Sequence, residues 1–270
     1  MRAGAGSIPQ LIREDIMRLL TTLTLAASTA LVLAACGGGG SGDIADQLNL
    51  SSPSARLVNA MPDGPALQLY RNADLQTDAG TPTYEQSSKY FETVTATSTW
   101  SVRDASTNLQ IGSASVAAAG STRYTLMAFP NTTTGADLVQ ISDPFDVSLT
   151  GDNARVRVVN GSPNSSTFDV YMTAPGVDLN TVSPTLASIA YEQAMPASGQ
   201  DSYAFPGATY ELRLTLAGTK TVFFDGTFSA VPNDDILLVT LPDSDVPGDV
   251  KILDIPSANS ELNSEILNDL

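Results

Sequence analysis

Residues 210–216 read Tyr-Glu-Leu-Arg-Leu-Thr-Leu, in which side chains alternate with a period of two. This period is typical of a β-strand that buries one face and exposes the other to water. Residues 217–219, Ala-Gly-Thr, can turn the chain, and residues 221–224, Thr-Val-Phe-Phe, can return it. The stretch therefore predicts a β-hairpin.

Other segments extend this pattern along the chain. Residues 236–241, Ile-Leu-Leu-Val-Thr-Leu, are almost continuously apolar, which predicts a central strand covered on both faces. Residues 99–103 and 109–112 predict a hairpin in the first half of the chain. Gly, Pro, Asn and Asp interrupt the pattern at short intervals, as in a β-sandwich. Residues 260–267 could form a short helix or trail as an acidic tail.

The chain contains one module twice. Residues 56–63 match residues 157–164 at an offset of 101, and Leu67-Gln68-Leu69-Tyr70 matches Phe168-Asp169-Val170-Tyr171 at the same offset. The offset grows to 107 for Tyr84-Glu85-Gln86 against Tyr191-Glu192-Gln193, and to about 112 for residues 124–129 against 236–241. A growing offset indicates small loop insertions between shared strands. Since the period of about 100 residues exceeds that of solenoid repeats, each copy should be a domain.

The shared segment resembles the opening of a bacterial family described as domain of unknown function (DUF) 4397, with the pattern Arg-Val-x-Asn/His-x-Ser-Pro, a spacer and Asp-Val-Tyr. The second copy keeps Arg157, Val158, Asn160, Ser162, Pro163, Asp169, Val170 and Tyr171. The first keeps Arg56, Asn59, Pro62 and Tyr70, but has Met61 and Gln68 in place of Ser and Asp. The resemblance spans roughly residues 54–256. It implies immunoglobulin-like sandwiches of exported, often lipid-anchored proteins, and it names no activity.

We therefore predict an all-β chain: two tandem immunoglobulin-like antiparallel β-sandwich domains that follow a signal peptide and a flexible linker. The predicted parts are a signal peptide (1–35), a lipidated cysteine with a Gly/Ser-rich tether (36–53), sandwich repeats (54–150 and 151–256) and an acidic C-terminal tail (257–270).

The signal peptide is inferred from an uncharged apolar run that follows Arg18 and ends in small residues. Glu14 and Asp15 fit a signal poorly, so Met17 is the expected start. Residues 33–36, Leu-Ala-Ala-Cys, resemble the lipobox of bacterial lipoproteins. In that family the cysteine, here Cys36, receives a diacylglycerol group, the peptide is cut before it, and the new amino terminus is acylated, as with palmitate. A transmembrane anchor is the alternative, but the run is short of about 20 residues.

The net charge of the chain limits the kinds of partner that it can bind. Cleavage before Cys36 would remove three basic and two acidic residues and leave 10 basic and 27 acidic ones, a formal charge of −17. A chain with this charge is not expected to bind nucleic acid or anionic lipid. The lipid on Cys36 would therefore hold the chain at the membrane. Gly37, rather than Asp, follows the cysteine, which in Gram-negative lipoproteins favours the outer membrane, on its periplasmic or surface face.

Composition also argues against catalysis. The chain has no histidine, which excludes Ser-His-Asp and Cys-His catalysis and His-ligated metals. No phosphate-binding glycine loop follows a predicted strand, and no cofactor is expected. Paired carboxylates for glycoside cleavage remain open, but no spacing favours them. We expect a protein that is not an enzyme.

Several residues are candidates for a site, each with a structural alternative. Arg56 and Arg157 stand out because basic residues are scarce, and the motif adds three ligand-binding candidates, Asn160, Asp169 and Tyr171. The structural alternative for the last of these, as for Tyr70, is a place in the core with the hydroxyl at its rim. Trp100 fits either the core or an exposed platform for a sugar. Asp243, Asp245 and Asp249 could hold Ca²⁺, which takes six to eight oxygens, or could form a solvated loop.

The sequence thus predicts an envelope protein with a non-catalytic binding or adhesion role, toward a polysaccharide or an envelope protein. Two other classes remain. A structural spacer would lack an exposed recognition patch, and a carboxylate-dependent hydrolase would gather acidic groups in a cleft.

Overall fold

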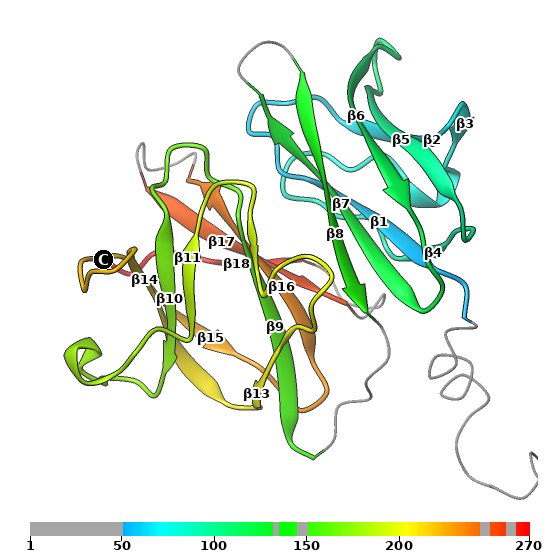
Figure 1. Ribbon diagram of the computed structural model, residues 1–270. Coiled ribbons are helices and arrows are strands. Elements are labelled where there is room, and N and C mark those ends of the chain that lie inside the picture. Colours follow the sequence, from blue (N-terminus) through cyan, green and yellow to red (C-terminus); the bar gives the residue numbers. More distant parts are fainter. Residues whose placement is uncertain (1–50, 132–134, 145–150, 244–248, 258–262) are drawn as a thin grey trace, which may run out of the picture. The chain divides into compact units, whose positions relative to one another are not determined.

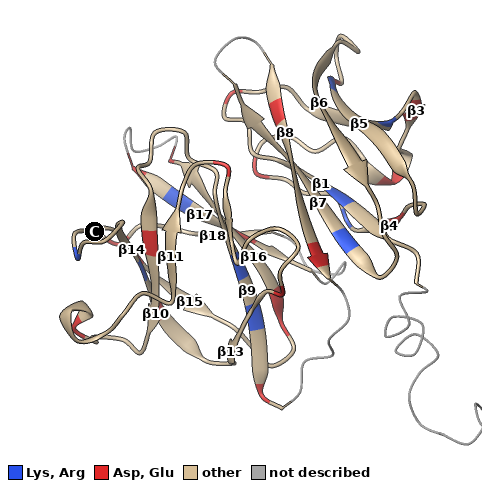
Figure 2. Cartoon of the chain, viewed as in Figure 1, with Lys and Arg blue, Asp and Glu red and all other residues tan. Residues whose placement is uncertain are grey.

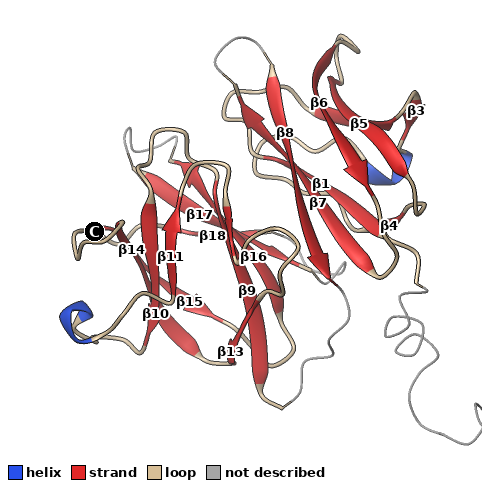
Figure 3. Ribbon diagram, in the orientation of Figure 1, coloured by secondary structure: helices blue, strands red, loops and turns tan. Residues whose placement is uncertain are grey.

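The computed structural model describes residues 51–131, 135–144, 151–243, 249–257 and 263–270. Strands dominate these ranges, and their helical elements are the short 3-10 turns η1 (Thr77–Ala79) and η2 (Leu179–Thr181) (Figure 3). The described residues all fall within one compact unit, residues 45–270. The prediction of an all-β chain with tandem sandwiches is confirmed.

The first repeat consists of two four-stranded sheets, with the orders β4-β1-β7-β8 and β3-β2-β5-β6 (Figure 1). Its apolar core takes side chains from both sheets, such as Leu57, Leu126 and Trp100. Its strands are β1 (Ser54–Asn59), β2 (Leu67–Arg71), β3 (Asp74–Leu75), β4 (Phe91–Glu92), β5 (Thr97–Asp104), β6 (Gln110–Ala117), β7 (Thr122–Pro130) and β8 (Ala136–Pro144).

The second repeat has the same plan. Its sheets are β11-β10-β14-β15 and β12-β9-β16-β17-β18, with β13 also paired to β9. Side chains of both sheets, such as Val158, Leu214 and Leu238, share a second core. Its strands are β9 (Asn153–Asn160), β10 (Phe168–Thr173), β11 (Leu186–Ile189), β12 (Ala194–Met195), β13 (Tyr203–Pro206), β14 (Thr209–Leu216), β15 (Val222–Ser229), β16 (Asp235–Pro242), β17 (Val250–Pro256) and β18 (Ser264–Ile266).

The predicted hairpins are present, and pairing differs from expectation in one respect. β14 pairs with β15, and β5 pairs with β6, both antiparallel. Gly218, in the first of these turns, has φ of 74°, a conformation that glycine adopts without strain. β1 runs parallel to β7, and β9 runs parallel to β16. The first strand of each repeat reaches this neighbour only after the chain has crossed to the other sheet, and such long connections permit parallel pairing.

The apolar run of residues 236–241 is covered on both faces, as predicted, but the second cover comes from the other repeat. Ile236 and Leu238 enter the core of the second sandwich. Leu237 and Val239 instead join a third cluster, which also contains Met127 of β7 in the first repeat. The full cluster is Val58, Ala60, Met127, Phe129, Ile141, Val159, Leu237, Val239, Leu241, Leu253 and Ile255. The two repeats therefore pack sheet against sheet.

The repeated Tyr-Glu-Gln segment is a turn that pairs with the end of the first strand. The amide of Asn59 donates to the carbonyl of Gln86, and the amide of Glu85 donates to the carbonyl of Asn59, both at 3.0 Å. The second repeat reproduces both bonds around Asn160. Glu85 has φ of 68°, and its counterpart Glu192 has φ of 63°. The turn thus belongs to the shared fold of the repeats.

The C-terminal segment differs from both expectations for it, since it is neither a helix nor a free tail. β18 pairs antiparallel with β17, with Leu253 opposite Glu265. Just before it, Asn263 accepts a hydrogen bond from the Ser87 hydroxyl at 2.9 Å and donates to the Glu85 carbonyl at 3.0 Å. The sequence pattern of residues 260–267 is too short to distinguish a strand, and the free edge of β17 supplies the pairing partner.

Candidate functional site

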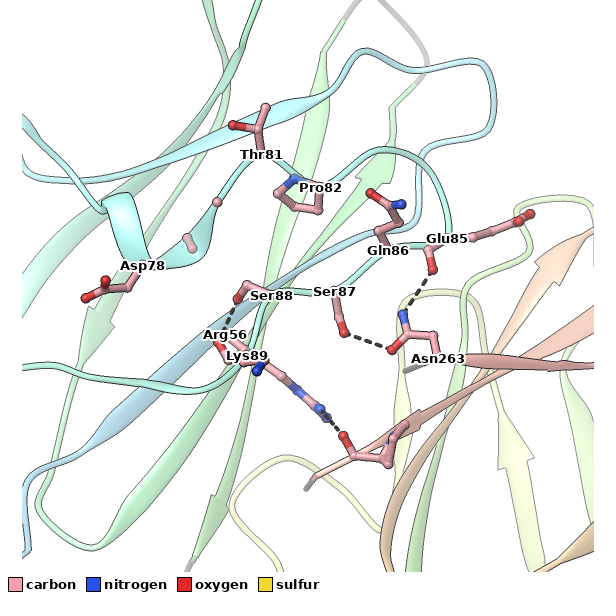
Figure 4. Close-up of a pocket in the computed structure, with 13 residues that line it drawn as sticks. Arg56, Asp78, Thr81, Pro82, Glu85, Gln86, Ser87, Ser88, Lys89 and Asn263 are labelled. Carbon is pink, nitrogen blue, oxygen red and sulfur yellow. Dashed lines mark hydrogen bonds between the residues drawn. The ribbon is translucent and has the colours of Figure 1, made fainter. Parts of the chain in front are cut away.

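A hollow of about 550 Å³ lies beside β1, along the segment that joins η1 to β4 (Figure 4). This volume suits a small molecule. Nine of its thirteen lining residues are polar or charged; the full lining is Arg56, Asp78, Ala79, Gly80, Thr81, Pro82, Glu85, Gln86, Ser87, Ser88, Lys89, Pro256 and Asn263. Residues 78–89 belong to the first repeat. Pro256 is the last residue of β17, and Asn263 directly precedes β18.

Arg56 is the buried cation of this lining. Only 3 % of the residue is exposed. Its Nε donates to the Thr125 hydroxyl at 3.0 Å, its Nη1 donates to the Pro256 carbonyl at 3.1 Å, and its guanidinium lies 4.5 Å from the centre of the Tyr90 ring. Burial lowers the pKa of Arg56 below its ordinary value. Neutral groups therefore provide its close contacts, and no carboxylate lies within ion-pair distance of it in the described residues.

Behind Arg56 lies a charge cluster that joins the two repeats, with basic positions on β1, β7 and β9 and an acidic one on β8 (Figure 2). Asp143 of β8 lies 3.2 Å from Arg123 and 3.0 Å from Arg157. Asp235 of β16 pairs with Arg123 and lies 3.1 Å from Arg155. Together with Arg56, the cluster holds four guanidinium groups and two carboxylates.

The ion pairs change the proton affinity of this cluster. Burial alone would raise the pKa of Asp235, but the guanidinium groups of Arg123 and Arg155 hold it below its usual range. Burial would lower the pKa of Arg123, but Asp235 above all raises it. Both partners are therefore ionised at neutral pH.

Arg56 and Arg157 occupy equivalent positions but differ in how they are satisfied. Arg157 donates to the carbonyls of Pro196 and Gln200, to that of Ala197 at 2.8 Å, and to Asp143. The position equivalent to Asp143 is Ser257, since Ile141 and Ile255 lie opposite equivalent residues of β7 and β16. The first repeat therefore lacks the carboxylate that the second repeat's arginine receives.

A loop insertion explains the remaining difference. In the first repeat two residues, 89 and 90, separate Ser88 from β4. In the second repeat seven residues, 196–202, separate the equivalent Met195 from β13, which is five more. This longer loop supplies the three carbonyls around Arg157, and its Gly199 amide donates to the Ser142 carbonyl at 2.8 Å. The first repeat has no such loop, and the hollow lies at the corresponding place.

The predicted motif residues are buried and engaged in structural contacts. Asn160 accepts hydrogen bonds at Oδ1 from the Ser162 amide and the Thr240 hydroxyl, both at 3.2 Å. Asp169 accepts from the amides of Ser188 and Gly218, both at 2.8 Å. These two side chains fix turns of the backbone, which is the structural alternative that the sequence left open.

The other candidates from the motif are also buried in structural contacts. Tyr171 is 1 % exposed, and its hydroxyl accepts from the Lys220 ammonium at 2.8 Å. Arg157, with Asp143, belongs to the charge cluster at the contact of the two repeats. The described structure therefore places Arg157, Asn160, Asp169 and Tyr171 in separate structural contacts.

The suggestion of an exposed sugar platform at Trp100 is wrong. Trp100 is 2 % exposed and packs 6.4 Å from Phe91, between ring centroids, in the core of the first sandwich. It alternates with polar neighbours on β5 because its face of the strand points toward the opposite sheet. A buried ring has no surface to offer a glycan.

The proposed calcium residues are only partly within the described ranges. Asp245 lies outside them. The Asp243 amide donates to the Asp249 carbonyl at 3.0 Å, and the carboxylate of Asp249 accepts from the side-chain amide of Asn268 at 2.7 Å. Among the residues that the structure describes, no group of three or more His, Cys, Asp or Glu side chains could hold a metal ion.

The proposed lipidation residue, Cys36, also lies outside the described residues. No helix within the described ranges has the length and apolarity needed to cross a membrane.

Sequence reasoning identified Arg56 but missed Lys89, Asp143 and Asp235, because these residues are not part of the repeated motif. A signal existed at one position. Arg123 and Asp235 are equivalent at the offset of 112, and they carry opposite charges. A basic residue in one copy that faces an acidic residue at the same place in the other can indicate that the copies contact each other.

The comparisons with known proteins agree with the motif. No curated protein matches the chain. The match to a family model starts at Pro53, just before β1, and ends in β10 of the second repeat. It is shorter than the span of roughly 54–256 expected from the resemblance, and it contains the shared motif of both repeats. Residues 53–171 thus match the family described as domain of unknown function (DUF4397).

Proposed function

We propose that this chain is a lipid-anchored protein of the cell envelope with a non-catalytic binding role, in which the two repeats act as one body and the hollow beside Arg56 receives the ligand. The observation that carries the binding role is the hollow itself. It has the volume of a small-molecule site, and a buried arginine without a carboxylate partner borders it.

The sequence supports the anchor. An uncharged apolar run leads to Leu33-Ala34-Ala35-Cys36, and the Gly/Ser-rich stretch that follows suits a tether between a lipid and a folded body. Several acyl chains hold a protein to a membrane firmly, since each buried CH₂ contributes about 0.8 kcal/mol. Gly37 favours the outer membrane, on either of its faces.

Fractionation of cells tests the anchor. The substitution Cys36→Ser should move the protein from the membrane to the soluble fraction and abolish its labelling with palmitate. Ser41→Ala, in the same tether, is the matched control and should leave both unchanged. Full retention of the Cys36→Ser protein in the membrane fraction would show that the lipid anchor is wrong.

A structural spacer is the second candidate, and a specific observation favours it. The motif side chains shared by the repeats are engaged in internal contacts, and the two sheets bury an apolar cluster between them. Thermal unfolding with a glycan panel and calcium separates the candidates. A ligand at a hundred times its Kd stabilises by about 2.7 kcal/mol, whereas a spacer should show no shift.

A further inference from the structure

The second repeat shows what satisfies the arginine that opens the motif. Arg157 has one carboxylate, that of Asp143, and three carbonyls around its guanidinium. Arg56 has one hydroxyl, one carbonyl and the face of the Tyr90 ring. A buried cation that lacks an anionic partner is costly, so the first repeat has an unfilled requirement for negative charge.

The hollow gives a ligand access to this place. Arg56 is one of its lining residues, and Lys89 and Ser88 lie next to it in Figure 4. Lys89 is exposed, and its ammonium has no ion-pair partner among the described residues. Two cationic side chains therefore border the same part of the hollow.

The acidic residues of the lining do not cancel this charge. Glu85 is paired with the ammonium of Lys251 at 2.7 Å. Asp78 belongs to η1, and its carboxylate points away from Arg56 (Figure 4).

The remaining lining suits a polyhydroxylated molecule. The Thr81 hydroxyl and the Gln86 side-chain amide nitrogen donate no hydrogen bond to other described residues, and both residues are exposed. Such groups can bond to the hydroxyls of a sugar, whereas an apolar ligand would leave them unsatisfied.

We propose that the hollow binds a small sugar acid, such as a uronic acid, whose carboxylate approaches Arg56 from the side of the hollow. Arginine suits this group because its planar fork matches a carboxylate. Lys89 assists as a second cation at the mouth. This inference rests on the proposed binding role, and it is independent of the lipid anchor.

The test uses the purified full chain and sodium glucuronate, with glucose and sodium chloride at matched ionic strength as controls. Isothermal titration measures the affinity, and NMR shifts of the Ser87, Ser88 and Lys89 amides locate the site. Glucuronate should bind and shift these amides, and the two controls should not.

Two substitutions each remove one positive charge, at different places. Lys89→Gln should weaken glucuronate about tenfold, as expected for loss of a charge-assisted contact. Arg103→Gln is the control, because Arg103 stacks on Tyr70 in the other sheet of the same repeat and is not part of the hollow. Arg56→Gln should abolish binding, provided that circular dichroism shows an intact fold.

Three results would overturn the inference: no heat and no amide shifts with glucuronate, equal binding of glucose, or equal weakening by Lys89→Gln and Arg103→Gln. If glucuronate fails while Cys36→Ser still releases the protein from membranes, the sugar-acid site is wrong and the proposed anchor stands.

Discussion

The substitution Asp143→Asn should destabilise the whole described unit, because Asp143 joins the two repeats. Its carboxylate lies 3.2 Å from Arg123 in its own sheet and 3.0 Å from Arg157 across the contact. The Ser202 hydroxyl also donates to it at 3.4 Å. Asparagine keeps the shape but removes the charge, so two buried guanidinium groups lose an ionic partner.

The structure sets the size of the effect. Breaking a buried ion pair costs about 3–5 kcal/mol. The Asp143 side chain is 13 % exposed, and asparagine still offers one acceptor oxygen, so we expect a loss of about 2–3 kcal/mol. For a unit of this size, such a loss lowers the melting temperature by about 4–12 °C.

Thermal and urea unfolding followed by circular dichroism measure this loss. Asp152→Asn is the matched control, because Asp152 is exposed and only its backbone carbonyl accepts a hydrogen bond, from Gly207. The control should melt within about 1 °C of the unsubstituted protein, as is usual for surface changes. If both substitutions shift the melting temperature equally, the charge cluster does not hold the repeats together.

Four further perturbations test other parts of the structure. Tyr84→Phe and Tyr191→Phe each remove a hydroxyl that donates 3.2 Å across the contact, and each should lower the free energy of unfolding by about 1 kcal/mol in urea titrations. The folded state lowers the pKa of Asp235, so the ionised carboxylate stabilises the fold above the unfolded pKa of about 3.9, and this stabilisation is lost as the pH falls through the folded pKa. The free energy of unfolding should therefore be lower at pH 3 than at pH 6, and the difference should be smaller in Asp235→Asn. Trp100 fluorescence should be blue-shifted and shielded from acrylamide until the protein unfolds, because the ring is buried. Gly161→Ala should cost about 1–3 kcal/mol by the same titration, because its Cβ would meet the Thr240 carbonyl oxygen at 2.7 Å.

The sequence was sufficient for several of the strands and for the duplication. Alternation located the hairpin of β14 and β15, because side-chain period depends only on local geometry. It could not locate β18, whose three residues form a strand only because the edge of β17 is available. Nor could it place Trp100, because a strand pattern states which residues share a face and not what covers that face.

For the candidate site as well, the sequence predicted some features and could not predict others. Arg56 and Arg157 are equivalent in the sequence, and the motif treats them alike. Their difference depends on Asp143 and on the loop of residues 196–202, and both reach Arg157 from distant parts of the chain. The growth of the repeat offset from 107 to 112 did record the five inserted residues, but only the structure shows that they close over an arginine.

The contact between the repeats also explains how a duplicated module can acquire one site where two would be expected. The tyrosine of each Tyr-Glu-Gln turn donates to the carbonyl of the last residue of the other repeat's long strand, Tyr84 to Pro242 and Tyr191 to Pro130, so the same surfaces meet in a near-twofold arrangement. At such a contact a position close to the axis faces its own equivalent. Arg123 and Asp235 are such a pair, and they form an ion pair.

Two identical copies would place like charges together at that position, which is unfavourable. Opposite charges at this position require that the two repeats differ in sequence. The ion pair then favours contact of the first repeat with the second over contact between two copies of the same repeat. Once the copies differ, one arginine of the motif can be closed in by a carboxylate and a longer loop while its equivalent stays open. The asymmetry that leaves Arg56 beside the hollow is thus of the same kind as the asymmetry that fixes how the two repeats pair.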